Sequence, residues 1–76
     1  MTRIEIARGG GVTLVSLGNG LAYELSCNGE AGTVFVQGDD AEELRATWDG
    51  LEIVFPHAHT TLLLREMWGM YGELAA

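Results

Sequence analysis

The chain has 76 residues, the length of one domain, so we expect a single domain over residues 1–76. Its hydrophobic content of 47% excludes an intrinsically disordered chain, and no apolar run approaches the roughly 20 residues of a membrane-spanning helix. Eleven acidic residues oppose four arginines, and the net charge of −7 disfavours nucleic acid and anionic membranes as partners. A basic protein surface is the expected counterpart, although solubility alone also explains a negative charge.

Two features of the sequence indicate the compartment. Cys27 is the only cysteine, so no intramolecular disulfide can form, as is typical of proteins in a reducing cytoplasm. Residues 1–5 carry Arg3 and Glu5 and lack a long apolar stretch, which argues against a secretory signal. We therefore expect a cytoplasmic protein.

The first half of the chain has the pattern of four short strands. Alternating or β-branched residues, which are typical of half-buried strands, occupy residues 2–8, 12–17, 21–27 and 33–37. One face of the third strand is expected to carry Leu21, Tyr23, Leu25 and Cys27. Between the strands lie Gly9-Gly10-Gly11 and two pairs that favour a type I′ hairpin turn, Asn19-Gly20 and Asn28-Gly29. The pattern predicts an antiparallel meander.

After Gly38 the period of the pattern changes to that of a helix. Asp39 is the expected N-cap, and Glu42 three residues later allows a capping box. One side of this helix carries the apolar residues Ala41, Leu44 and Trp48. Gly50 stands where a helix commonly ends, so the sequence predicts a helix of about ten residues.

The last third of the chain completes the predicted fold. Residues 51–55 form either a fifth strand, closed by Pro56, or irregular structure. A final helix is expected from a cap at Thr60 or Thr61 to about residue 74, with a kink or an early end near Gly69. This order of elements predicts an α+β fold, in which two helices pack on one face of an antiparallel four- to five-stranded meander.

No constellation of side chains predicts an enzyme. His57 and His59 form a His-x-His pair that can ligate a metal, but a structural zinc site needs four ligands, and Cys27 is distant in sequence and alone. No basic residue stands beside Cys27 to activate its thiol. We expect no catalytic residue, no cofactor and no metal, and a metal-dependent enzyme that uses the two histidines is a third hypothesis.

Two features indicate a binding surface instead. The first predicted helix carries an acidic run of Asp39, Asp40, Glu42, Glu43 and Asp49. A solvated helix face that suits the N-terminal dipole is the commoner explanation of such a run. The last helix carries Trp68 and Tyr71 within an apolar arc wider than a surface helix needs. These aromatic residues either fill the core or form an interface, for example that of a homodimer.

Residues 34–51, from Val34-Phe35-Val36-Gln37-Gly38 to Trp48-Asp49-Gly50-Leu51, resemble small anti-CRISPR proteins of phages and mobile elements. The shared features are a strand, an acidic cap, a short helix that ends in an aromatic residue and Gly-Leu, and a second helix. The resemblance implies a protein that acts in the host bacterial cell by binding a Cas subunit, at the basic surface that would hold DNA or crRNA. It assigns no role to individual residues.

Together these features predict an inhibitor that binds a type I Cas effector complex (Cascade) and blocks nucleic-acid binding by occlusion. The five carboxylates of the acidic run are expected to pair with Lys and Arg of the target, and Trp68 and Tyr71 are the expected apolar anchors. The alternative is a small homodimeric structural or antitoxin-like interaction domain.

Overall fold

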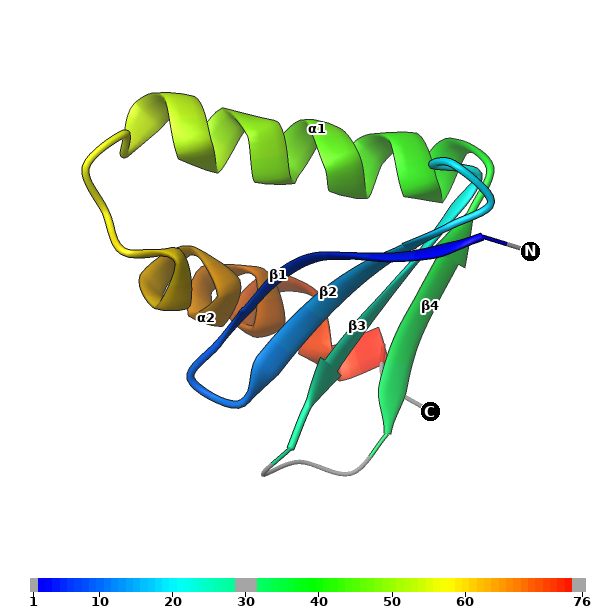
Figure 1. Cartoon of the computed structure of the whole chain (residues 1–76), viewed down its shortest axis with the longest axis horizontal. Coiled ribbons are helices and arrows are strands. Elements are labelled where there is room, and N and C mark those ends of the chain that lie inside the picture. The colour runs from blue at the N-terminus through cyan, green and yellow to red at the C-terminus, as the bar shows by residue number, and fades with distance from the viewer. Residues whose placement is uncertain (1, 29–31, 75–76) are drawn as a thin grey trace.

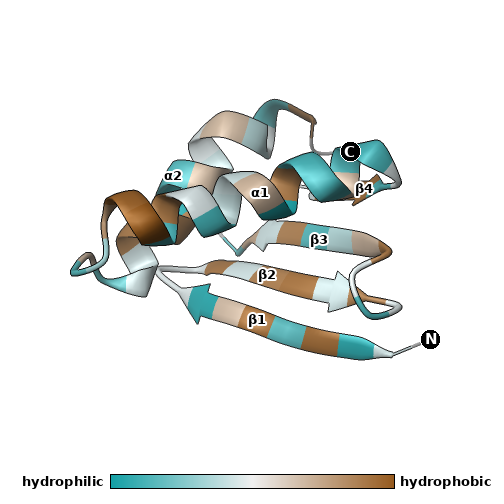
Figure 2. Cartoon of the chain, turned by 90° about the horizontal axis from the view of Figure 1, so that it is seen from above, coloured by the Kyte–Doolittle hydropathy of each residue, from teal (hydrophilic) through white to brown (hydrophobic). Residues whose placement is uncertain are grey.

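The computed structural model describes residues 2–28 and 32–74. Four antiparallel strands lie in the order β1-β2-β3-β4, and two helices follow them in the chain. The bounds are Arg3–Gly9 (β1), Val12–Leu17 (β2), Ala22–Cys27 (β3), Thr33–Gln37 (β4), Asp39–Val54 (α1), Thr60–Tyr71 (α2) and a 3-10 turn at Gly72–Leu74 (η1). Both helices lie on one side of the sheet (Figure 1 and Figure 2), which confirms the predicted α+β meander.

The β2–β3 hairpin confirms the predicted Asn-Gly turn. Asn19 and Gly20 have φ values of 58° and 95°, the positive values that a type I′ turn requires, and the Leu21 amide donates to the Gly18 carbonyl at 3.4 Å. Leu21 therefore lies in the turn and is exposed, so its predicted place in the strand, on the same face as Tyr23 and Leu25, is wrong, and β3 begins one residue later. In the second predicted turn, Gly29 lies outside the described residues.

The hydrophobic core lies between the sheet and the two helices. Successive strand residues point to opposite faces, and the residues that face the helices are Val12, Leu14, Tyr23, Leu25, Val34 and Val36. The helices contribute Ala41, Leu44 and Trp48 from α1 and Leu63, Leu64 and Met67 from α2. Because each fully buried leucine stabilises the fold by about 1.5–3 kcal/mol relative to an exposed one, this cluster is the main stabilising contact of the chain.

The opposite face of the sheet carries no helix within the described residues, yet its centre is buried. Val15 and Ala22 have little exposed surface there. Arg3 on β1 and Glu24 on β3 form an ion pair, which therefore passes over β2. Val15 lies in register between Glu5 and Glu24, so charged side chains flank this buried residue on both sides.

The first helix is longer than the sequence predicts. α1 has 16 residues and continues through Gly50 to Val54, so the predicted helix end, and with it a strand or irregular structure from residue 51 to residue 54, is wrong. Leu51 extends the inner side of the helix and packs against the core, and this burial offsets the roughly 1 kcal/mol that a helical glycine costs. The helix ends at Phe55, whose amide donates to the Leu51 carbonyl at 2.9 Å.

Both helices begin with caps that differ from the predicted ones. Gly38, with a φ of 62°, is the cap of α1 and no side chain bonds there, so Asp39 is the first helical residue and the predicted capping box is wrong. His59 is the cap of α2, because its Nδ1 accepts the Thr61 amide at 3.1 Å, and the prediction of Thr60 or Thr61 is wrong. Each observed cap therefore lies one residue before the first predicted candidate, and glycine, but not histidine, is among the residues that favour this position.

The second helix runs unbroken through Gly69 to Tyr71 and continues as η1 to Leu74. α2 therefore ends three residues before the predicted end near residue 74, which only the 3-10 turn reaches, and the predicted early end at Gly69 is wrong. The reason is again tertiary packing, since the inner side of α2 is fixed to the sheet by Leu63, Leu64 and Met67. Within the described part of the chain, neither helix combines the length and the apolar content that crossing a membrane requires.

Gly50 offers a direct test of whether α1 continues through residue 50. A Cβ added at Gly50 would meet no atom within 4 Å, and the backbone there is helical. We predict that Gly50→Ala raises the free energy of unfolding, measured by urea denaturation, by about 0.5–1 kcal/mol. Gly38→Ala is the matched control, because it has equal space but a φ of 62° that disfavours alanine, so its free energy of unfolding should fall. A loss of stability in both variants would contradict the helical assignment of residue 50.

Candidate functional site

The outer side of α1 concentrates negative charge. Its inner side is buried against the sheet through Ala41, Leu44 and Trp48, so the polar residues of the helix face solvent. Four of them lie within the first five residues and are all exposed, namely Asp39, Asp40, Glu42 and Glu43, and we call these four the acidic end of α1. Negative charge at a helix N-terminus is favoured by the helix dipole, so this arrangement is compatible with a stable helix.

The four carboxylates of the acidic end and Asp49, the fifth predicted carboxylate, have different partners. None of the four forms an ion pair with a residue that the structure describes. Asp49 lies further along α1 and accepts a hydrogen bond from Arg45 Nε at 3.1 Å. The Tyr23 side chain and then Asp49 raise the pKa of Arg45, and a guanidinium is charged at any ordinary pH. Asp49 is thus locally compensated, whereas the acidic end is not.

The other three arginines do not neutralise the negative charge of the acidic end. Arg3 and Arg8, both on β1, pair with glutamates of the sheet. Arg65 of α2 donates to the Gly10 carbonyl at 3.4 Å. Six carboxylates and one arginine give α1 a net charge of −5, out of −7 for the whole chain. A positively charged partner is therefore attracted most strongly toward α1.

The two predicted aromatic anchors are partly used inside the fold. Trp68 and Tyr71 are half-buried and pack against the core. Thr47 Oγ1 donates to the Glu43 carbonyl at 3.0 Å, so the Tyr71 hydroxyl, 3.1 Å from the same Oγ1, is the donor of the second bond. A Cβ added at Gly72 would come within 3.0 Å of the Trp68 ring, so the chain turns closely around that ring. Only the remaining surface of each aromatic residue is open to a partner.

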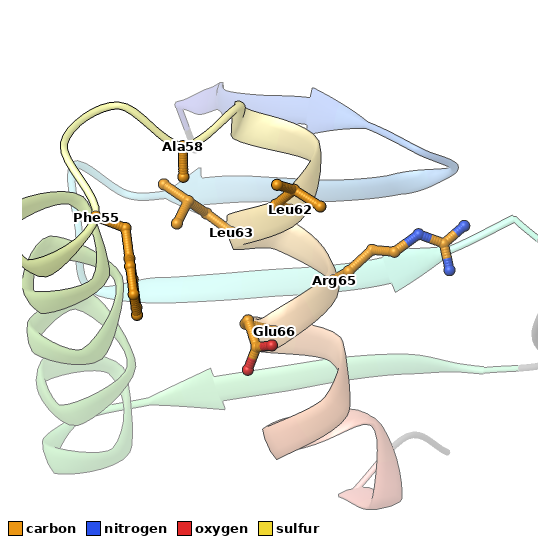
Figure 3. A pocket seen from close by; sticks show the side chains of 6 residues that line it. All are labelled: Phe55, Ala58, Leu62, Leu63, Arg65 and Glu66. Atoms are coloured by element: carbon orange, nitrogen blue, oxygen red, sulfur yellow. The ribbon is translucent and has the colours of Figure 1, made fainter.

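Large apolar side chains are exposed at the opposite end of α1. Ile53 is 77% exposed and Phe55 is 51% exposed, and together with the exposed Val54 and Leu62 they form what we call the apolar patch. Beside Phe55, a pocket of about 390 Å³ opens between the end of α1 and the start of α2 (Figure 3). Its lining residues are Phe55, Ala58, Leu62, Leu63, Arg65 and Glu66. Exposed apolar surface that gathers in this way is typical of protein interaction sites.

The acidic end and the apolar patch lie at the two ends of one helix. The 16 residues of α1, at about 1.5 Å per residue, place them roughly 20 Å apart. That separation exceeds the screening length of about 8 Å at physiological salt. The two surfaces can therefore contribute independently, one through charge and the other through buried apolar area.

The apolar patch is the part of the surface that the sequence reasoning missed. Residues 51–55 were predicted as a strand or as irregular structure, and neither prediction indicates which of their side chains are exposed on a helix. Leu51 continues the apolar line of Ala41, Leu44 and Trp48 in the sequence, but Gly50 was given more weight as a helix end. Once the helix is extended, its period of 3.6 residues places Ile53 on the side opposite the core.

The two histidines have separate surroundings. His59 Nδ1 is engaged by the Thr61 amide, as described above. His57 is exposed in the same loop. No group of three or more His, Cys, Asp or Glu side chains within residues 2–28 and 32–74 is arranged to hold a metal ion. Cys27 is half-buried and packs against the core.

The role of His59 as a cap can be tested by substitution. We predict that His59→Ala lowers the free energy of unfolding by about 1 kcal/mol, because the Thr61 amide loses its acceptor, and that His59→Asn retains most of the stability. His57→Ala is the control and should change the free energy of unfolding by less than about 0.5 kcal/mol. Urea denaturation measures all three. Equal losses at the two histidines, together with a loss on adding a chelator, would show instead that they bind a metal as a pair.

Known proteins supply no additional assignment of this surface. No protein-family model, no curated protein and no solved structure matches this chain. The functional inference therefore rests on the charge of the acidic end and on the exposure of the apolar patch.

Proposed function

We propose that this chain is a protein-binding inhibitor without catalytic activity, which docks the acidic end of α1 on a basic surface of its partner. One observation carries the proposal. Asp39, Asp40, Glu42 and Glu43 lie exposed within five consecutive residues, and no cation of the described residues neutralises them. A compact cluster of this sign attracts Lys and Arg side chains and steers a basic partner toward the helix.

The partner that we propose is a Cas subunit of a type I effector complex. The basis is the resemblance of residues 34–51 to anti-CRISPR proteins, and these residues form β4 and most of α1, including the acidic end. A Cas surface that holds DNA or crRNA must present Lys and Arg to neutralise phosphates. Carboxylates that pair with those side chains exclude the nucleic acid, so occlusion is the proposed mechanism.

Charge alone does not make such a complex tight. Charges at the rim of an interface act mainly on the association rate and on specificity, while buried apolar and aromatic side chains carry most of the affinity. Phe55 and Leu62 in the apolar patch are exposed and available for this purpose. Trp68 and Tyr71 remain proposed contacts through the parts of their side chains that the fold leaves open.

A homodimeric structural or antitoxin-like domain is the second candidate function. The observation that favours it lies on the sheet, where β4 forms an edge without a charged residue. A second copy of the chain can extend the sheet at such an edge. The two candidates use different surfaces, so experiments can separate them.

Charge reversal tests the proposed docking surface. We predict that Glu42→Lys/Glu43→Lys weakens binding to a purified type I effector complex by at least about tenfold at low salt, because two rim ion pairs become repulsive contacts. Titration calorimetry at low and at high salt measures the affinity. The wild-type affinity should fall as salt rises, and the variant should show a smaller dependence on salt.

The matched control reverses the same number of charges elsewhere. Glu5→Lys/Glu73→Lys changes two exposed glutamates, of β1 and η1, that lie outside the acidic end and outside the pocket, and Glu5 gives up only a surface ion pair with Arg8. Its affinity should stay within about threefold of wild type, apart from the general effect of net charge. Equal weakening in both double variants, or wild-type binding that ignores salt, would contradict docking through the acidic end. Absence of binding to type I effectors would contradict the proposed partner.

A further inference from the structure

The two edges of the sheet are built differently. At the β1 edge lie three charged residues, Arg3, Glu5 and Arg8, and a register shift between Glu5 and Ala7. Charges and bulges are the usual means by which an edge strand is kept from pairing with another chain. β4, the opposite edge, has the sequence Thr-Val-Phe-Val-Gln and pairs with β3 in a regular register. It therefore lacks the protection that β1 carries.

The outer side of β4 offers backbone groups with which another strand can pair. Within the described residues, β4 forms its ladder with β3 alone, so the backbone groups on its other side have no strand partner. Val34 and Val36 are buried toward the helices, whereas Phe35 points to the opposite face and is 55% exposed. Leu74, in the turn η1 that lies against β4, is exposed as well. Apolar surface therefore flanks the edge on both faces of the sheet.

We propose that β4 pairs antiparallel with β4 of a second copy, so that two four-stranded sheets join into one of eight strands. A two-fold axis through Phe35 sets the register. Phe35 then lies opposite Phe35 of the second copy, Val34 lies opposite Val36, and Thr33 lies opposite Gln37. Each of these pairs matches apolar with apolar or polar with polar, which is the self-complementarity that a two-fold interface requires.

Charge also favours this arrangement over a parallel one. The acidic end begins at Asp39, four residues beyond Phe35, which corresponds to about 13 Å of extended strand. The two-fold axis places the two acidic ends on opposite sides, roughly 26 Å apart along the strand direction, which is about three screening lengths at physiological salt. A parallel pairing would place them side by side. Because both copies carry a net charge of −7, added salt should strengthen this dimer.

The salt dependence separates this inference from the proposed function. Binding of the acidic end to a basic partner weakens as salt rises, whereas association of two acidic copies strengthens. Sedimentation equilibrium over a range of concentrations, at low and at high salt, should show a dimer whose dissociation constant decreases with salt. Phe35→Lys should weaken the dimer at least about tenfold, because two like charges would face each other at the axis. Ile53→Lys, in the apolar patch, is the control and should leave the dimer intact.

A disulfide test reports the register itself. In a Cys27→Ser background, Phe35→Cys should form a covalent dimer on mild oxidation, since directly opposed Cα atoms lie about 4.5–5.5 Å apart, within the range of a disulfide. Thr33→Cys alone should not, because its two copies would lie roughly 13 Å apart. A mixture of Thr33→Cys and Gln37→Cys should cross-link again.

Three results would overturn the inference. The first is a wild-type chain that remains a monomer at every concentration and salt. The second is a dimer that Ile53→Lys disrupts and Phe35→Lys does not, which would move the interface to the apolar patch. The third is cross-linking of Thr33→Cys with itself, which would contradict the antiparallel register. Phe35 and Ile53 are exposed, so lysine at either position is compatible with the fold, and circular dichroism checks that every variant is folded.

Discussion

The packing of two helices against a single face of the sheet is the contact on which the rest of the structure depends. Leu14 and Leu25 from the sheet meet Leu44, Leu64 and Met67 from the helices, and all five side chains are fully buried. A chain of 76 residues can build only one such apolar layer. The outer sides of both helices, the edges of the sheet and its second face consequently remain surface.

Because only one apolar layer forms, α1 has a buried inner side and an exposed outer side. Its inner side is committed to the core, so the outer side can carry residues that contribute little to stability. The acidic end lies on this outer side, and the apolar patch lies where α1 ends and α2 begins. Together they supply the charge attraction and the apolar area that protein recognition combines. The β4 edge is a third surface, separate from α1 and free of charge, which suits contact between copies of an acidic chain.

Local pattern was sufficient for most of the fold. Strand alternation and the Asn19-Gly20 turn report backbone preferences directly, and so they predicted the meander. The length of α1 was not predictable in this way, because the local cost of Gly50 is outweighed by burial of Leu51, a tertiary effect. The acidic end could be read from the sequence, since charge needs no fold to be recognised. The apolar patch could not, because Ile53 and Phe55 become a surface only once the helix extends past Gly50.

Footprinting of carboxylates is the most direct measurement of the central claim, that the outer side of α1 recognises the partner. Carbodiimide-driven labelling, read by mass spectrometry, would compare the chain alone with the chain bound to a type I effector complex. We predict reduced labelling of Asp39, Asp40, Glu42 and Glu43 in the complex, with Glu5 and Glu73 unchanged. Unchanged labelling of the acidic end in a complex that forms, with protection on α2 or on the sheet instead, would contradict it.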